Sequence, residues 1–150
     1  MSFHGLKRLT TKADVDNVIR NTDDKLVVLR FGRDDNVDCM QIDKVLDKCQ
    51  REVSKMAVIY IVDVDAVPIY RSYFDITIIP SVVFFFNAQH MKCDYGTQDH
   101  TKWVGPFVDK QDFIDLVWTF YRGAVRGKLI VQCPIDSSRV PKYQLFYQDI

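Results

Sequence analysis

Three short, almost uninterrupted apolar segments constrain the fold most strongly. Residues 26–31, 57–62 and 81–86 are rich in β-branched and aromatic side chains and lack alternating polar positions. Such segments predict strands buried on both faces, so the chain needs helices on both sides of a central sheet. Each is much shorter than the roughly 20 residues that cross a bilayer, so we expect neither a membrane span nor a membrane partner.

Helical periodicity places amphipathic segments between these strands. Thr11 is a candidate helix cap, and Val15, Val18 and Ile19 follow it on one helical face. The predicted helices are residues 12–21, 37–53, 67–73 and 109–123, with Gly123 as the stop of the last one. The predicted strands are residues 26–31, 57–62, 81–86 and 90–95.

This order of elements predicts one domain over residues 1–150. Parallel strands joined by helices, followed by a hairpin at residues 81–95, predict a three-layer α/β/α fold with a central mixed sheet. That is the thioredoxin-like layout. We expect residues 96–107 to form a long surface loop and residues 124–150 to form a C-terminal extension, a tail packed on the domain or on a partner.

Charge and cysteine content narrow the function classes. Twenty Lys and Arg balance twenty Asp and Glu, which removes the overall basic field typical of nonspecific binding to nucleic acid. No apolar stretch follows the N-terminal residues, so we expect a protein of the cytosol or nucleus rather than a secreted one. Cys39, Cys49, Cys93 and Cys133 form no closely spaced pair, so we expect no metal site and no cofactor.

A thioredoxin-type redox site would lie between strand 26–31 and the following helix. Counting from the strand end puts Asn36 at the position of the attacking cysteine and Cys39 at the resolving position. A resolving thiol alone cannot complete a dithiol cycle, because nothing forms the mixed disulfide that it would break. Asp34, Asp35 and Asp38 should also raise the pKa of Cys39. We therefore expect no catalytic residue here.

Two further residues belong to this degenerate redox site. Arg30 stands where active thioredoxins have a buried acid, and its side chain either leaves the strand for solvent or pairs with a nearby carboxylate. Ile79 and Pro80 precede a buried strand at the place where a structural cis-proline is expected.

Other catalytic arrangements are not supported. The sequence has no GxSxG, GxxxxGK[ST] or HExxH motif, and Asp63 with Asp65 is a carboxylate pair without further ligands. His4, His90 and His100 share no paired spacing, so we expect exposed or loop histidines rather than general bases.

The C-terminal third holds the candidate interaction residues. Arg122, Arg126 and Lys128 indicate either a solvated helix end or contact with RNA phosphates or an acidic partner. The tail is too apolar to stay solvated, so it should dock on the domain itself, on a partner or on a second copy. The aromatic interaction candidates are Trp103, Phe107, Tyr143 and Tyr147.

Short segments spread over the whole chain carry a family resemblance. They are VLRFGRD at 28–34 leading to the lone Cys39, FDI at 74–76, IPS at 79–81, FFFN at 84–87, QHMK at 89–92, DYG at 94–96, DHTK at 99–102, KQDFIDL at 110–116, YRGA at 121–124, RGKLIVQ at 126–132 and YQDI at 147–150. With these segments the sequence resembles the Dim family of spliceosomal thioredoxin-like proteins.

The resemblance implies a nuclear protein of the pre-mRNA splicing machinery that lacks redox activity and acts through protein contacts. It also implies a role in cell-cycle progression, a large spliceosomal scaffold protein as a partner, and self-association as a homodimer. The alternative interpretation is a thiol-dependent redox or redox-sensing protein that uses Cys39 alone.

Overall fold

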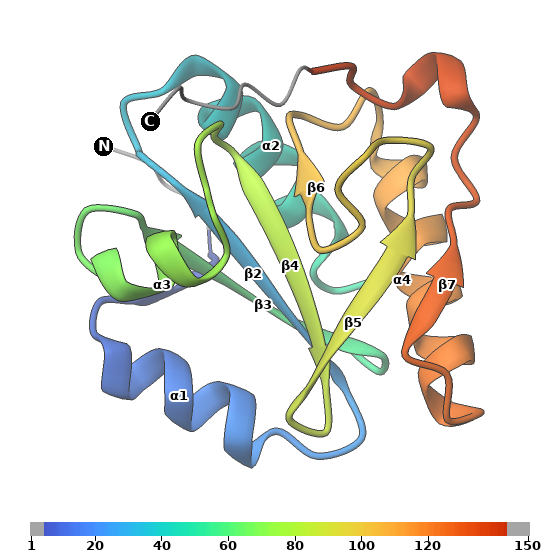
Figure 1. Cartoon of the computed structure of the whole chain (residues 1–150), viewed down its shortest axis with the longest axis horizontal. Coiled ribbons are helices and arrows are strands. Elements are labelled where there is room, and N and C mark those ends of the chain that lie inside the picture. The colour runs from blue at the N-terminus through green and yellow to red at the C-terminus, as the bar shows by residue number, and fades with distance from the viewer. Residues whose placement is uncertain (1–4, 144–150) are drawn as a thin grey trace.

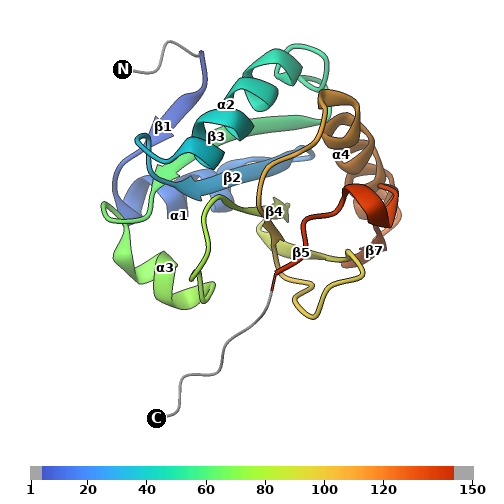
Figure 2. The same cartoon turned by 90° about the horizontal axis from the view of Figure 1, so that it is seen from above.

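The computed structural model describes residues 5–143. It shows a central sheet with helices on both faces (Figures 1 and 2). The strands are β1 (Lys7–Leu9), β2 (Leu26–Gly32), β3 (Ala57–Asp63), β4 (Ser81–Phe86), β5 (Gln89–Asp94), β6 (Trp103–Val104) and β7 (Ile130–Gln132). The helices are α1 (Lys12–Asn21), α2 (Val37–Cys49), α3 (Pro68–Tyr73) and α4 (Lys110–Val125), followed by a 3-10 turn at Ser137–Arg139. None of the helices within residues 5–143 is both long and apolar enough to span a bilayer.

The sheet is mixed, as the sequence predicts. Its strand order is β1-β3-β2-β4-β5-β7, and the short β6 pairs with β4. β2 runs parallel to β3 and antiparallel to β4, and β4 and β5 form the predicted hairpin. β1 and β7 extend the two ends of the sheet by parallel pairing with β3 and β5.

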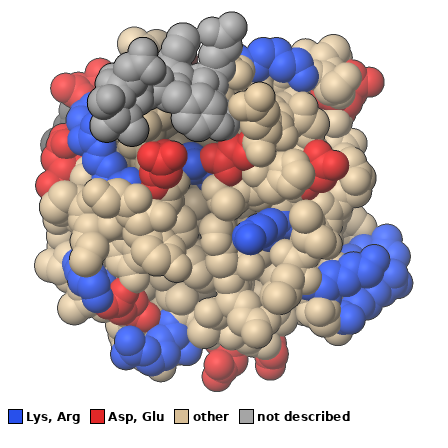
Figure 3. Space-filling view, in the orientation of Figure 1, with Lys and Arg blue, Asp and Glu red and all other residues tan. Residues whose placement is uncertain are grey.

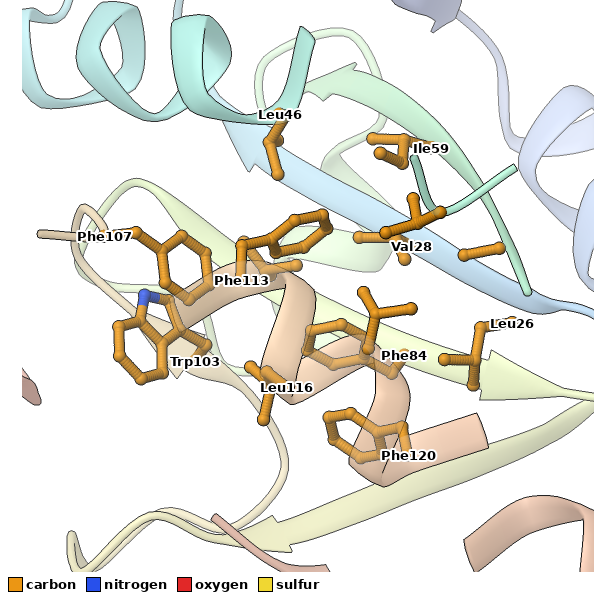
Figure 4. Packing of buried hydrophobic residues seen from close by; sticks show 14 of the residues in the cluster. Leu26, Val28, Leu46, Ile59, Phe84, Trp103, Phe107, Phe113, Leu116 and Phe120 are labelled. Carbon is orange, nitrogen blue, oxygen red and sulfur yellow. The ribbon is translucent and has the colours of Figure 1, made fainter. Parts of the chain in front are cut away.

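Alternate side chains of β2 enter two separate cores, which explains its uninterrupted apolar sequence. Leu26 and Val28 pack in the core formed with α2 and α4, where Phe84 and Phe120 stack with ring centroids 4.2 Å apart (Figure 4). Val27, Leu29 and Phe31 pack in the core on the opposite face, with side chains from α1 and around α3. The predicted three-layer α/β/α arrangement is confirmed.

The sequence predictions missed three short strands. β1, β6 and β7 contain only two or three residues each. Lys7 and Arg8 of β1 are exposed, as are Ile130 and Gln132 of β7, so neither strand shows a buried apolar pattern. Their pairing partners are distant in sequence, and only the assembled sheet fixes their register.

Helix α2 is shorter than predicted. It ends at Cys49, because the next residue turns more tightly: the Gln50 N–H donates to the Asp47 carbonyl, 3.4 Å away. Residues 50–56 form turns, in which the Val53 N–H still donates to the Cys49 carbonyl at 3.0 Å. Val53 is fully buried, so its helical spacing correctly indicated burial but not helix.

Gly123 does not stop α4, contrary to the prediction. The helix continues to Val125, and Gly127 ends it in a left-handed conformation with φ of 83°. The Gly127 and Lys128 N–H groups donate to the Ala124 and Gly123 carbonyls, both at 2.9 Å. Gly123 instead permits close packing, since a Cβ there would lie 2.4 Å from Val131 Cγ1 of β7.

The segment after α4 returns over the domain. Ile135 and Val140 are buried in the α2 and α4 core, and the Arg139 guanidinium binds the Asp112 carboxylate of α4 at 3.0 Å. Tyr143 is the last described residue, and the candidate interaction residue Tyr147 lies outside the described residues.

Replacing Gly123 should test the packing of β7 on α4. We expect Gly123→Ala to lower the free energy of unfolding by about 1–3 kcal/mol, because the new methyl group would overlap Val131. Gly5→Ala is the matched control, since the nearest atoms to its Cβ lie at 3.5 Å and 3.6 Å. Adding Val131→Ala should make the double variant less destabilised than the sum of the two single variants in urea denaturation. Additive losses would contradict this packing argument.

Candidate functional site

The candidate site is the junction between β2 and α2, beside the start of β4. Pairing of β2 with β4 places Phe31 opposite Ser81. The Ile79–Pro80 peptide bond just before Ser81 is cis, at the position for which the sequence predicts a cis-proline. The sheet thus brings the loop after β2, the first turn of α2 and Pro80 to one place.

Asn36, which the sequence count aligns with an attacking cysteine, has a structural role here. It is the N-cap of α2, and its side-chain Oδ1 accepts a hydrogen bond from the Cys39 N–H at 2.9 Å. An amide oxygen that caps a helix satisfies a backbone donor and supplies no thiol. The side chain of Asn36 therefore stabilises the start of α2.

Cys39 is buried beneath the end of β2. Its side chain is fully buried, and a Cβ on Gly32 would lie 2.4 Å from its Sγ. Burial is the main cause that raises the pKa of the Cys39 thiol, and the charges of Asp43 and Asp38 contribute less. The carboxylate of Asp34, which the sequence predicts to act on Cys39, lies 2.9 Å from Arg8 Nη2 and 3.6 Å from Arg30 Nη2. Cys39 is thus an uncharged core side chain.

Arg30 forms a buried ion pair rather than reaching solvent. Its Nε and Nη2 donate to the two carboxylate oxygens of Asp43, at 2.8 Å and 2.5 Å. Arg30 is fully buried and Asp43 is 4% exposed. The strand end does not open to water, because β2 lies between β3 and β4 and α2 covers it. A permanently charged guanidinium is not a proton acceptor at this position.

Trp103 and Phe107 do not lie on a surface loop, so their interpretation as interaction residues is wrong. They are 1% and 0% exposed, and their rings stack with centroids 4.4 Å apart (Figure 4). β6 pairs Trp103 with Val82 of β4, and the indole Nε1 donates to the Gly105 carbonyl at 2.8 Å. The segment lacks periodicity because it folds over the end of the core as a short strand and a turn.

The histidines and remaining carboxylates form no acid–base site among residues 5–143. His90 is half-buried in β5, contrary to expectation, with Nε2 2.8 Å from the Thr101 carbonyl, and burial lowers its pKa. His100 lies 3.6 Å from the Asp94 carboxylate, whereas Asp65 binds Arg33 at 2.8 Å.

In the same described range, no cluster of three or more His, Cys, Asp or Glu is placed to hold a metal ion. His4 falls outside that range.

A neighbouring thiol pair escaped the sequence analysis. Cys93 and Cys133 lie 40 residues apart in sequence, and the parallel pairing of β5 with β7 brings them together. The Cys133 N–H donates to the Asp94 carbonyl at 3.1 Å, next to Cys93 in β5. The neighbouring Cys133 thiol and burial hold the pKa of Cys93 above its usual range. Both cysteines are free thiols, and neither belongs to the junction of β2 and α2.

The predicted basic residues lie away from this junction. Arg122, Arg126 and Lys128 are exposed at and just beyond the C-terminal end of α4, as the sequence predicts for a helix end. Tyr143 is half-buried beside Tyr95 at the end of the described chain. The structure therefore divides the candidate interaction residues between the core and separate surfaces.

Comparison with known proteins identifies close relatives. A family model described as "Mitosis protein DIM1" matches residues 5–137. "Thioredoxin-like protein 4B" of Mus musculus is 61% identical over 150 residues, which cover all of both chains. "Spliceosomal protein DIB1" of Saccharomyces cerevisiae is 37% identical over 131 residues, covering 87% of this chain and 92% of that protein.

Solved structures support the fold. A thioredoxin of Malassezia sympodialis superimposes with a TM-score of 0.61 and 20% sequence identity, covering 81% of this chain and 95% of that one. The predicted thioredoxin-like fold is confirmed. The mixed central sheet and the helices on its two faces are retained here, whereas the junction between β2 and α2 is filled by Asn36 and a buried Cys39.

Alkylation should distinguish a core thiol from a reactive one. At pH 7 we expect iodoacetamide to modify Cys39 of the folded protein more slowly than Cys39 of the urea-unfolded chain by about tenfold or more. Burial restricts access and raises its pKa. Peptide mass spectrometry separates the four cysteines, and the half-buried Cys133 serves as the internal control. Rapid labelling of folded Cys39 at pH 6 would contradict the interpretation of Cys39 as a core thiol.

Breaking the buried ion pair should destabilise the whole domain. We expect Asp43→Ala to cost about 3–5 kcal/mol of unfolding free energy, because it leaves the Arg30 charge buried without its partner. Arg30→Met combined with Asp43→Leu should cost less than Asp43→Ala, since it removes both charges. Chemical denaturation of the three proteins measures this, and a double variant no more stable than the single one would refute the argument.

Proposed function

The chain belongs to the DIM1 family, and on that premise we propose that it is a noncatalytic thioredoxin-like protein of the pre-mRNA splicing machinery. It acts through protein–protein interactions in the nucleus and contributes to cell-cycle progression. The name of the yeast relative supports the splicing role, and the description of the family model supports the link to mitosis.

The packing of the junction between β2 and α2 is the observation that supports this proposal. Asn36 caps α2, and Cys39 is fully buried against Gly32. A thiol that solvent does not reach and whose pKa is raised cannot readily attack a partner's disulfide. The chain retains the fold while the residues at the site stabilise it.

Exposed apolar side chains beside the degenerate site support binding of a protein. Val37 and Met40, in the first turn of α2, are 78% and 49% exposed. Burial of this apolar surface against a partner is favourable, whereas Cys39 in the same turn already belongs to the core. The partners that we propose are spliceosomal proteins, including a large scaffold protein, together with a second copy of the chain.

Capture from nuclear extract tests the proposal. The tagged protein should retain spliceosomal proteins after ribonuclease treatment, since the contacts are to protein and not through RNA. Cys39→Ser should retain the same set, whereas Val37→Asp with Met40→Asp should lose at least part of it. Ile69→Asp with Tyr73→Asp, at two exposed residues of α3, is the matched control for the two added charges.

Two results would contradict the proposal. Recovery of thiol substrates only, trapped through Cys39 and lost in Cys39→Ser, would favour the alternative of a redox or redox-sensing protein. Spliceosomal proteins that disappear on ribonuclease treatment would instead indicate association through RNA. Thermal melts of each variant establish that a lost partner does not reflect an unfolded chain.

A further inference from the structure

A groove runs between the C-terminal half of α4 and the outer edge of β7, at the margin of the molecule where these elements lie side by side (Figure 1). Its volume is about 530 Å³. Basic side chains gather at this margin (Figure 3). Among the residues that line the groove are Trp118, Arg122, Arg126, Lys128, Ile130 and Gln132.

The outer edge of β7 presents backbone groups that no described strand uses. β7 is the last strand in the sheet order. On its inner side the Leu129 carbonyl accepts from the Lys92 N–H at 2.8 Å, and the Cys133 N–H donates to the Asp94 carbonyl at 3.1 Å. Because alternate residues of a strand face alternate neighbours, the N–H and carbonyl groups of Ile130 and Gln132 point away from β5. Such an edge is a template for another strand.

The groove is positively charged. Arg122, Arg126 and Lys128 form no ion pair with any carboxylate in the described part of the chain. By contrast, several other arginines contact aspartates, namely Arg8, Arg30, Arg33, Arg71 and Arg139. The groove has a single carboxylate, Asp94, which faces His100 at 3.6 Å. Three cations beside one carboxylate that already contacts His100 favour a negatively charged ligand.

Trp118 gives the groove an apolar wall and positions one of its cations. The indole is 50% exposed, and the Arg122 guanidinium lies over it, 5.5 Å from the ring centroid. Ile130 is 52% exposed on the other side of the groove. An occupant therefore meets apolar surface, cations and free backbone groups together.

We propose that this groove binds an extended, acidic segment of a partner protein, which pairs with β7 as an additional strand and directs its carboxylates to Arg122, Arg126 and Lys128. The free backbone groups of Ile130 and Gln132 match a peptide backbone, which is why a peptide fits this edge better than a nucleic acid does. This surface is separate from the first turn of α2, so the inference goes beyond the proposed function and is tested apart from it.

Strand geometry specifies the occupant further. Alternate side chains of a strand point to the same face, so a segment with acidic residues at every second position turns all of them toward α4. β7 has three residues, so the pairing is short, and the charges and Trp118 must contribute much of the affinity. Binding should therefore weaken steeply as salt is added.

A blocked octapeptide of alternating glutamate and valine, carrying a fluorescent label, is the probe. Anisotropy at low salt should show saturable binding to the full chain. Arg122→Gln with Arg126→Gln should weaken binding by about tenfold or more. Arg20→Gln with Arg51→Gln removes the same charge from exposed arginines elsewhere and should leave binding within about twofold of the unaltered chain.

Two measurements test pairing with the strand edge. Ile130→Pro removes an N–H that faces away from β5, so it should abolish binding without disturbing the pairing of β5 with β7. In the unaltered chain, bound peptide should slow hydrogen exchange at the Ile130 and Gln132 amides. This second measurement decides the matter even if Ile130→Pro fails to fold.

Three outcomes would overturn the proposal. Equal binding of the matching glutamine and valine peptide would show that charge does not select the ligand. Unchanged exchange at Ile130 and Gln132 on binding would show that no strand is added. Binding of a single-stranded oligouridylate, with no binding of the acidic peptide, would assign the groove to nucleic acid instead.

Discussion

The buried ion pair between Arg30 and Asp43 ties the central strand to α2. A guanidinium without solvent contact must be neutralised within the protein, and Asp43 does so with two hydrogen bonds across the interface of β2 and α2. This contact joins α2 to the sheet beside the apolar packing of Ile42 and Leu46. Gly32 follows from this constraint, since a Cβ there would lie 2.8 Å from Arg30 Nη1 and 2.4 Å from Cys39 Sγ.

The same packing explains how a thioredoxin-like fold exists here without the dithiol. Arg30 occupies the space beneath the junction, Cys39 completes the core beside it, and Asn36 caps the helix above. The packing and hydrogen bonds of these three side chains make the junction part of the folded core. Surfaces elsewhere remain available for contacts, among them the first turn of α2 and the edge formed by β7 and α4.

The segment after α4 changes what one margin of the sheet presents. β7 covers the outer edge of β5, which places Cys133 beside Cys93 and leaves a new edge facing solvent. Gly123 is the residue that permits this, because only a glycine lets Val131 approach α4 so closely. Since α4 ends at the same margin, Arg122 and Arg126 lie next to an edge that no strand within residues 5–143 pairs with, rather than at an isolated helix end.

The sequence by itself determined the central strands, the positions of the helices, the absence of a CxxC pair and the place of Pro80, because these depend on local composition and spacing. It also predicted that Asn36 and Cys39 lie together at the junction after the first central strand, and the structure places both in the first turn of α2. Only the tertiary structure decided that Asp43 is the partner of Arg30 and that Trp103 and Phe107 are core residues. It also decided that Gly123 serves packing rather than helix termination, and that β7 adds a new edge to the sheet. These outcomes depend on contacts between residues far apart in sequence, for which a short segment carries no periodic signal.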